Sequence, residues 1–242
     1  MLIERAGPAY IATKPQLACF ERLGAPGWEA LEQTVTAARD AGLLVIADGK
    51  RGDVPVSAAA YGLALVGATA TSWGEVAGLG ADAFTANPLL GGDSLDTMLE
   101  AAAEAGAGVF TLVRTSNPGA ADVLDLPAPE VPLHERLAAM LAGRSERLAG
   151  TGPGRGLSGV GAVAGATEPR FLGRLRELMP AAIFLLPGVG AQGGSAADIG
   201  PAYSAHPASV LVSASRSIAT AADPGEAALR LRDEIGAVAP QS

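Results

Sequence analysis

Short apolar runs alternate with longer segments of helical periodicity along the whole chain. The short runs are mostly apolar and contain β-branched residues, which is typical of strands buried on both faces of a parallel sheet. Seven such strands are predicted, over Ala9–Lys14, Leu43–Asp48, Asp82–Asn87, Val109–Val113, Gly159–Ala164, Ile183–Pro187 and Val210–Ser215.

The segments between these runs predict helices. The clearest are Trp28–Asp40, Val56–Ala68, Leu95–Ala105, Leu133–Leu148, Glu168–Leu178 and Gly225–Val238. Strands that alternate with helices imply a parallel sheet with right-handed crossovers, and at 242 residues a β/α barrel is favoured over an open sheet. Residues 1–242 are therefore predicted to form a single β/α-barrel domain, although a closed barrel needs eight strands and seven are found.

Composition narrows the class of function. The formal net charge of −8 argues against a nucleic-acid-binding surface. Cys19 is the only cysteine, so no intrachain disulfide can form and a cytoplasmic setting is expected. The chain has no apolar run of transmembrane length, and its first residues lack the apolar block of a signal peptide, so no membrane partner is expected.

Residues 43–57 change abruptly from apolar to charged. Four charged residues fall within six positions, namely Asp48, Lys50, Arg51 and Asp53. Side chains alternate in direction along an extended strand, so Asp48 and Lys50 are predicted to share a face. A structural salt bridge at a strand end explains these charges equally well. Lys14 also ends an apolar run, which favours a functional cluster at a shared edge of the sheet.

Two further segments follow later strands. Thr115–Gly119 contains Asn-Pro, and composition alone favours a structural turn there. Pro187–Gly194 contains Gly-x-Gly-x-x-Gly, whose glycines expose backbone N–H donors. A dinucleotide site is disfavoured, because the motif occurs late and lacks an acidic ribose partner at the expected spacing. Arg216 follows the last strand, where β/α barrels commonly bind phosphate, so it is a candidate phosphate ligand.

The segment Asp48-x-Lys50-Arg51-Gly52-Asp53-Val54, with Ser57 after it and Lys14-Pro15-Gln16 before it, resembles the orotidine 5'-phosphate decarboxylase family. The similarity is greater to the longer bacterial (type 2) subfamily, and it extends over nearly the whole chain. The sequence departs from that pattern at Gly49, where alanine is usual, and at Pro55, where a small residue is usual.

The resemblance implies a (β/α)8 TIM barrel, a fold that in this family begins with a strand and a helix ahead of the Lys14 segment. This chain is expected to lack that first strand and helix. The activity implied is cofactor-free conversion of orotidine 5'-monophosphate to uridine 5'-monophosphate and CO2, a step of pyrimidine biosynthesis. No cofactor and no metal are expected.

The resemblance also implies roles for individual residues. Lys50 would stabilise the carbanion at C6 of the pyrimidine and protonate it, and Asp48 would hold Lys50 beside the departing carboxylate. The expected catalytic residues are Lys14, Asp48, Lys50 and Asp53. Of these, Asp53 would enter the active site of the neighbouring subunit of a homodimer. The residues expected to bind substrate are Val54, Ser57, Ser116, Pro187, Gln192, Gly193 and Arg216, of which Ser116 would contact the pyrimidine and Gln192 and Arg216 the phosphate.

Two alternatives remain open at this point. One is a Mg²⁺-dependent sugar-phosphate decarboxylase of the same superfamily, since such enzymes also carry the Asp-x-Lys-x-x-Asp pattern. The other is a catalytically weak relative that binds nucleoside monophosphates. His134 and His206 have no partner at metal-ligand spacing, so each is interpreted as a surface or capping residue.

Overall fold

The structure is a computed structural model that describes residues 2–240. Its contacts divide the chain into two compact units, Met1–Val109 and Phe110–Ser242. In the first unit, strands β1 (Ala12–Thr13), β2 (Leu44–Arg51) and β5 (Ala83–Ala86) lie side by side in that order, and both neighbouring pairs are parallel.

The core of the first unit is built from the apolar runs that predict its strands. All four residues of β5 are buried, as are Val45, Ile46 and Ala47 of β2. Helix α3 buries Leu31, Val35 and Ala38, which recur at helical spacing. The helical segments of this unit are α1 (Leu2–Ala6), η1 (Gly7–Ala9), α2 (Leu17–Glu21), α3 (Ala25–Asp40), α4 (Pro55–Leu65) and α5 (Gly92–Ala105).

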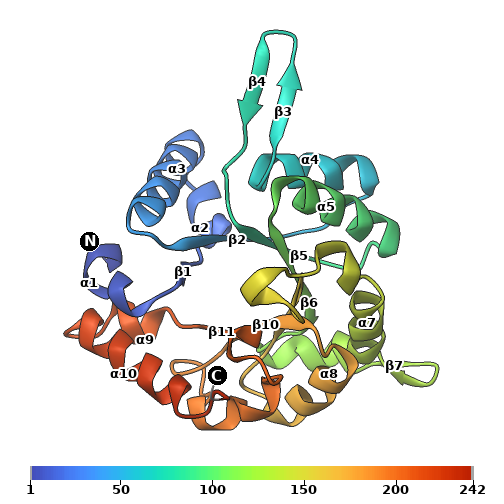
Figure 1. The fold of residues 1–242 in the computed structure, drawn as a ribbon, viewed down its shortest axis with the longest axis vertical. Helices are drawn as coiled ribbons and strands as arrows, with labels where there is room; N and C mark the ends of the chain where they lie inside the picture. Colours follow the sequence, from blue (N-terminus) through green and yellow to red (C-terminus); the bar gives the residue numbers. More distant parts are fainter. Residues whose placement is uncertain (1, 241–242) are drawn as a thin grey trace. The chain divides into compact units, whose positions relative to one another are not determined.

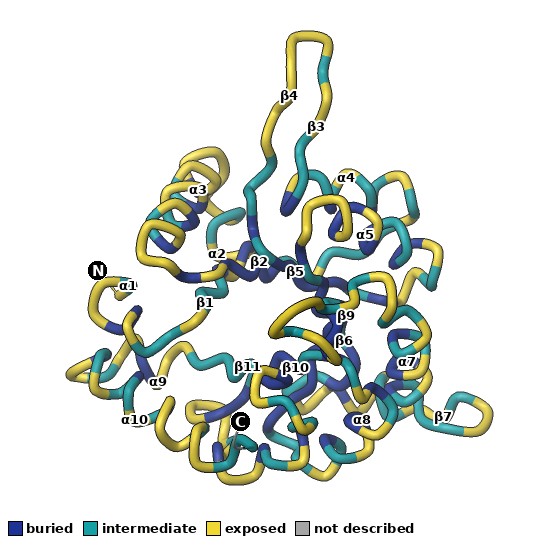
Figure 2. The backbone as a smooth tube through the Cα atoms, in the orientation of Figure 1, coloured by how far each residue is buried: buried dark blue, intermediate teal, exposed yellow. Residues whose placement is uncertain are grey.

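A hairpin that the sequence pattern does not predict projects from the end of α4 (Figure 1). It consists of β3 (Ala68–Thr71) and β4 (Gly74–Ala77), which pair antiparallel. Its residues are exposed or half-buried (Figure 2), and Trp73 at its turn is 82% exposed. The predicted helix Val56–Ala68 ends at Leu65 instead. Because the hairpin buries no apolar face, it leaves no hydrophobic periodicity in the sequence.

In the second unit, β6 (Gly108–Arg114), β9 (Ser158–Ala164), β10 (Ala182–Pro187) and β11 (Val210–Ser213) lie in that order. The pairs β9–β10 and β10–β11 are parallel, and Phe184 and Leu186 of β10 are fully buried. The other elements are η2 (Pro118–Ala120), α6 (Ala121–Leu124), β7 (Pro127–Ala128), β8 (Val131–Pro132), α7 (Leu133–Ala142), η3 (Ser145–Leu148), η4 (Gly152–Gly154), η5 (Pro169–Phe171), α8 (Leu172–Leu178), η6 (Ala196–Ala202), η7 (Pro207–Ser209), α9 (Arg216–Ala219) and α10 (Pro224–Gly236).

A buried arginine ties several of these segments together. The Arg176 guanidinium of α8 lies 3.9 Å from the ring centroid of Phe184, and among the described residues it donates only to carbonyl oxygens. The acceptors are those of Met179, Pro180, Ala182, Ala202 and Ser209. Burial lowers the pKa of Arg176 to about 10, so it remains charged at neutral pH. This cation is therefore solvated by backbone dipoles in place of water.

Each of the seven predicted strands overlaps an observed strand. The six predicted helices are also present. Besides the earlier end of α4, Leu133–Leu148 is divided into α7 and η3, and Glu168–Leu178 begins as η5 before α8. Within residues 2–240, no helix is both long enough and apolar enough to cross a membrane.

Candidate active site

A buried carboxylate in β2 accepts hydrogen bonds from two ammonium groups. The Asp48 side chain is 6% exposed. Its Oδ1 accepts from Lys50 Nζ at 2.6 Å, and its Oδ2 accepts from Lys14 Nζ. The prediction that Asp48 and Lys50 share a face is confirmed, as is the convergence of Lys14 from the neighbouring strand. We refer to Lys14, Asp48 and Lys50 as the lysine–aspartate cluster.

The chain after β1 is held against this cluster. The Asp48 N–H donates to the carbonyl oxygen of Pro15 at 3.0 Å, and Gln16 forms an isolated parallel bridge with Asp48. With the Gln16 amide oriented so that its nitrogen faces Asp48, that nitrogen donates to Oδ2 at 3.1 Å and to the backbone oxygen. The Lys14-Pro15-Gln16 segment therefore contributes two side-chain donors, from Lys14 and Gln16, to the Asp48 carboxylate, and one main-chain acceptor, the Pro15 oxygen, to the Asp48 N–H.

The electrostatics of the cluster favour a charged Asp48. Burial raises the pKa of Asp48, but charge and hydrogen bonds from Lys14 and Lys50 outweigh burial and lower that pKa below its ordinary value. Two ammonium groups face one carboxylate, which leaves a net positive charge. The Lys50 side chain is 40% exposed, so part of it is open to a ligand while its ammonium remains paired with Asp48.

Lys50 has an unusual backbone. Its φ is +48°, and within residues 2–240 it is the one non-glycine residue with positive φ. The β2–β5 register shifts between Ala47 and Arg51, and the Lys50 N–H donates to Oγ1 of Thr85 at 2.8 Å. Thr85 also donates to Oδ1 of Asp48 at 2.8 Å. Sequence reasoning missed Thr85; the available signal was a hydroxyl within an apolar run.

The two departures from the family pattern fit the local structure. A Cβ placed on Gly49 would lie 2.7 Å from Cδ1 of Leu17, which is fully buried, so an alanine there would require Leu17 to move. Pro55 is the first residue of α4, a position where its fixed φ and missing N–H are tolerated. Arg51 has a structural role, since it pairs with Glu21 and lies 5.4 Å from the ring centroid of Tyr61.

The next three predicted residues form no hydrogen bond or ion pair with the cluster in the described part of the chain. The Asp53 carboxylate accepts from the Val54 N–H at 2.7 Å, and no contact with Lys14, Asp48 or Lys50 is found in the described part of the chain. Val54 is 53% exposed, and Ser57 is half-buried in the first turn of α4. Within residues 2–240, Asp53, Val54 and Ser57 are therefore not joined to the cluster of their own chain by a hydrogen bond or ion pair.

In the second unit, two predicted substrate-binding residues meet. Ser116 Oγ donates to Oε1 of Gln192 at 3.0 Å. The Ser116 carbonyl oxygen accepts from Thr167 Oγ1 at 2.9 Å. A Cβ on Gly188, whose φ is +112°, would lie 3.0 Å from Thr167 Cγ2 and 3.3 Å from Ser116 Cβ. The glycine therefore allows the loop after β10 to approach the Ser116 turn.

The loop after β10 is a tight backbone turn. It starts at Pro187, the last residue of β10, and is closed by bonds from the Gly193 N–H to the Gly190 oxygen at 2.8 Å and from the Gly194 N–H to the Gly188 oxygen at 2.9 Å. A Cβ on Gly190 would lie 3.1 Å from Ser217 Oγ, so the loop lies against the start of α9.

The last predicted residue, Arg216, is the first residue of α9. It is exposed, and its guanidinium makes no hydrogen bond or ion pair within residues 2–240. Its donors are therefore open to a ligand, as expected of a phosphate-binding arginine.

A second cluster of charged side chains was not predicted. It includes Arg114, which lies two residues before Ser116 in the chain. Arg114, which is 4% exposed, donates to Asp125 at 2.7 Å (Nε to Oδ1) and 3.0 Å, and to the Thr115 carbonyl oxygen at 2.8 Å. His134 Nδ1 lies 3.3 Å from Asp125 Oδ1 and 2.8 Å from the Leu124 carbonyl oxygen. We refer to Arg114, Asp125 and His134 as the arginine–aspartate cluster.

The predictions for the two histidines have different outcomes. The interpretation of His134 as a surface or capping residue is wrong, because it is 3% exposed and lies edge-on to Phe171. His206 does cap a short helix, since its Nδ1 accepts from the Ala208 N–H at 3.1 Å. Within the described residues, no group of three or more His, Cys, Asp or Glu side chains could hold a metal ion.

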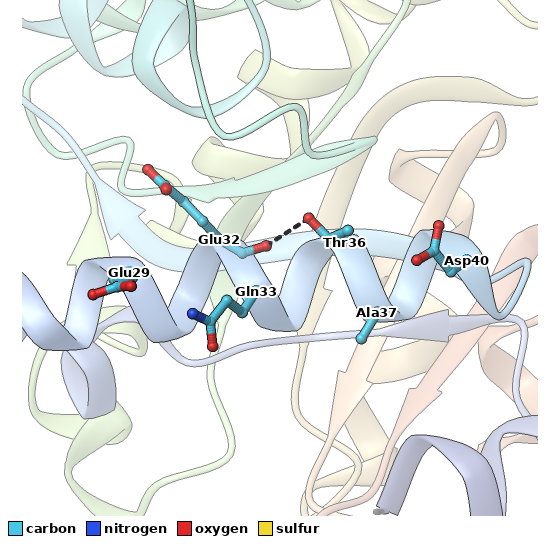
Figure 3. A pocket seen from close by; sticks show the side chains of 6 residues that line it. All are labelled: Glu29, Glu32, Gln33, Thr36, Ala37 and Asp40. Carbon is cyan, nitrogen blue, oxygen red and sulfur yellow. Dashed lines mark hydrogen bonds between the residues drawn. The ribbon is translucent and has the colours of Figure 1, made fainter.

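A shallow pocket lies along the outer face of α3 (Figure 3). Its lining is mostly acidic or amide, and consists of Glu29, Glu32, Gln33, Thr36, Ala37 and Asp40. Thr36 donates to the Glu32 carbonyl oxygen at 3.0 Å, as is common on an exposed helix face. None of the predicted site residues lines this pocket.

Comparison with known proteins gives a consistent result. The family described as "Orotidine 5'-phosphate decarboxylase / HUMPS family" matches residues 1–231. A Deinococcus radiodurans protein named orotidine 5'-phosphate decarboxylase is 44% identical over 97% of this chain and 82% of its own length. A Rhodopirellula baltica protein of the same name is 42% identical over 85% of this chain and 66% of its own length.

A solved structure supports the same assignment. The Leishmania donovani UMP synthase structure is 38% identical, with a TM-score of 0.82, over 98% of this chain and 48% of its own. This chain thus spans about half of that protein. The likeness confirms the predicted β/α-barrel fold. With a family match over almost the entire sequence, the chain belongs to the orotidine 5'-phosphate decarboxylase / HUMPS family.

Proposed function

We propose that this protein is an orotidine 5'-phosphate decarboxylase, which converts orotidine 5'-monophosphate to uridine 5'-monophosphate and CO2 in pyrimidine biosynthesis. The observation that carries the proposal is the lysine–aspartate cluster, in which Lys50 Nζ lies 2.6 Å from Asp48 Oδ1 and the Lys50 side chain is 40% exposed. This cluster occurs in a chain that is 44% identical to a protein of that name.

The reaction needs a fixed cation beside C6 of the pyrimidine. When the bond from C6 to the carboxylate breaks, CO2 departs and the electron pair stays on C6, where the ring offers no π system to receive it. The Lys50 ammonium stabilises that pair and then transfers a proton to C6, which completes the product. Lys50 is left neutral and regains its proton from solvent.

Asp48 and Lys14 prepare Lys50 for this step. Asp48 holds the Lys50 ammonium in place before reaction, so little reorganisation is needed as charge develops on C6. Lys14 balances the buried carboxylate and keeps it ionised. Breaking the Lys14–Asp48 pair would leave Asp48 with a single cation and allow the Lys50 ammonium to shift toward it.

The predicted ligand residues of the second unit bind the rest of the substrate. Ser116 hydrogen-bonds the pyrimidine ring, and Gln192, Gly193 and Arg216 bind the phosphate. Pro187 anchors the start of the loop that carries Gln192 and Gly193. Remote binding of a phosphate can be used to order a reacting centre, so these contacts raise the rate as well as the affinity.

The protein acts as a cytoplasmic homodimer with shared active sites. The observation that favours sharing is that the Asp53 carboxylate bonds only its neighbour Val54 among the described residues, and that Val54 is exposed. Asp53, Val54 and Ser57 enter the active site of the partner subunit. Mixing inactive Asp53→Ala and Lys50→Ala subunits would then restore part of the activity, whereas confirmed subunit exchange without recovery would contradict a shared site.

The function is tested by following decarboxylation of orotidine 5'-monophosphate by the purified chain without added metal. Turnover that persists in chelator and is abolished in Lys50→Ala supports the proposal. Turnover that requires Mg²⁺, or that acts on a sugar phosphate instead, favours the alternative decarboxylase. Nucleotide binding without turnover identifies a binding-only relative.

A further inference from the structure

A buried hydroxyl connects two residues of the lysine–aspartate cluster. Thr85 lies in β5 and is 1% exposed. Its Oγ1 donates to Asp48 Oδ1 at 2.8 Å and accepts from the Lys50 N–H at 2.8 Å. The Thr85 hydroxyl therefore donates to the Asp48 carboxylate and at the same time accepts from the backbone N–H of Lys50.

The backbone of Lys50 depends on such a partner. A φ of +48° places its Cβ close to its own carbonyl group, which is unfavourable for any residue other than glycine. Strained backbones of this kind persist only when surrounding contacts hold them. In the stretch where the β2–β5 register shifts, the Lys50 N–H bonds the Thr85 hydroxyl. That bond fixes the direction of the peptide N-terminal to Lys50.

The carboxylate of Asp48 is held by the same hydroxyl. Its Oδ1 accepts from both Thr85 Oγ1 and Lys50 Nζ. Two donors on one oxygen restrict rotation of the carboxylate plane. The position of the Lys50 ammonium is thus determined at both ends of its side chain by contacts that pass through Thr85.

We propose that Thr85 is a positioning residue for the decarboxylation, holding Lys50 in its left-handed backbone conformation and orienting Asp48 so that the Lys50 ammonium is fixed at the reacting carbon. This inference rests on the proposed function for its kinetic consequence. Thr85 acts through Asp48 and Lys50. Valine has nearly the same shape as threonine, so a role in packing alone would be satisfied by valine.

The test is Thr85→Val beside Thr85→Ser and a matched control, Thr111→Val. Thr111 is also fully buried in a strand, but its hydroxyl has no hydrogen-bond partner among the described residues. For Thr85→Val we expect kcat to fall at least about tenfold while KM changes less than about twofold, because positioning is lost and substrate contacts are kept. Thr85→Ser should retain most of the activity, and Thr111→Val should leave kcat and KM unchanged.

Two results would overturn the proposal. One is a Thr85→Val enzyme with the kcat of the natural chain; the other is a Thr85→Ser enzyme as impaired as Thr85→Val, which would assign the effect to the methyl group. Crystal structures of both variants give a readout independent of turnover. Thr85→Val should change the φ of Lys50 or lengthen the Lys50–Asp48 contact, whereas unchanged geometry contradicts positioning. If the natural chain fails to decarboxylate the nucleotide, the proposed function falls, but these structures still decide the role of Thr85.

Discussion

The lysine–aspartate cluster and the arginine–aspartate cluster both lie at or near the ends of parallel strands, yet they are built differently. In the first, one buried carboxylate faces two ammonium groups, and one of its lysines has a strained backbone and a 40% exposed side chain. In the second, Arg114 and Asp125 form a two-bond pair, and Arg114 is 4% exposed.

The difference separates a site that acts on a ligand from one that supports the fold. In the arginine–aspartate cluster each charge is matched, and Arg114 also holds the carbonyl oxygen of Thr115 next to Ser116. In the lysine–aspartate cluster a positive charge remains in excess, and the side chains of Lys14 and Lys50 are 23% and 40% exposed. Excess charge together with strain is typical of a functional site, whereas matched charge is typical of structure.

The largest expected effect is on the activity of Lys50 variants. Lys50→Ala and Lys50→Gly should both lose at least about 10⁴-fold in kcat, since Lys50 supplies charge stabilisation as well as the proton. Their stabilities should differ, because glycine adopts a φ of +48° freely and alanine does not. We expect the free energy of unfolding, measured by urea denaturation, to be about 1 kcal/mol higher for Lys50→Gly than for Lys50→Ala.

Equal stability of the two Lys50 variants would show that the backbone of this lysine relaxes without cost. The contrast between the two clusters would then rest on charge alone. Retained turnover in either variant would remove Lys50 from the mechanism altogether.

The arginine–aspartate cluster should show the opposite behaviour. Asp125→Ala leaves Arg114 buried without its carboxylate, so we expect the free energy of unfolding to fall by about 2–3 kcal/mol, somewhat less than for a fully buried pair. Asp122→Ala is the matched control, because Asp122 is an exposed carboxylate close by in α6. A stability loss in Asp122→Ala equal to that in Asp125→Ala would contradict a specific role for the pair.

Arg216 extends the comparison to a cation that has no partner among the described residues. Arg216→Ala should weaken binding of uridine 5'-monophosphate by about 10- to 100-fold, the range for one charge-assisted contact, and leave uridine binding and stability nearly unchanged. Calorimetric titration of both ligands measures this. Arg155→Ala removes another exposed arginine and serves as the control. Equal loss for nucleotide and nucleoside would refute the phosphate assignment.

The smallest expected effect is on acid stability. A hydrogen bond from Arg114 lowers the pKa of Asp125, so Asp125 contributes stability above the ordinary aspartate pKa of about 3.9, and this contribution is lost as pH falls through the lowered value. Unfolding measured from about pH 5 downward should therefore be less pH-dependent in Asp125→Ala than in the natural chain. The same slope in both proteins would show that Asp125 titrates alike when folded and unfolded.

Sequence by itself determined the strands, the helices and the charged segment of β2. These features are local: a strand buried on both faces needs a continuous apolar run, and alternation along an extended chain puts Asp48 and Lys50 on one face. The convergence of Lys14 followed from the topology, because parallel neighbours end at one edge. The sequence also shows the departures at Gly49 and Pro55, but it does not show the local structure that accommodates them.

Only the tertiary structure decided the contacts across space. Thr85 meets Asp48 and Lys50 because the β2–β5 register shifts, and no local pattern encodes that shift. Leu17 occupies the space beside Gly49, and Asp125, which follows η2 and α6, reaches back to Arg114. In each case, packing of segments that are distant in the sequence brings these groups together. Sequence periodicity does not determine which groups meet, so it cannot predict the hydrogen bonds between them.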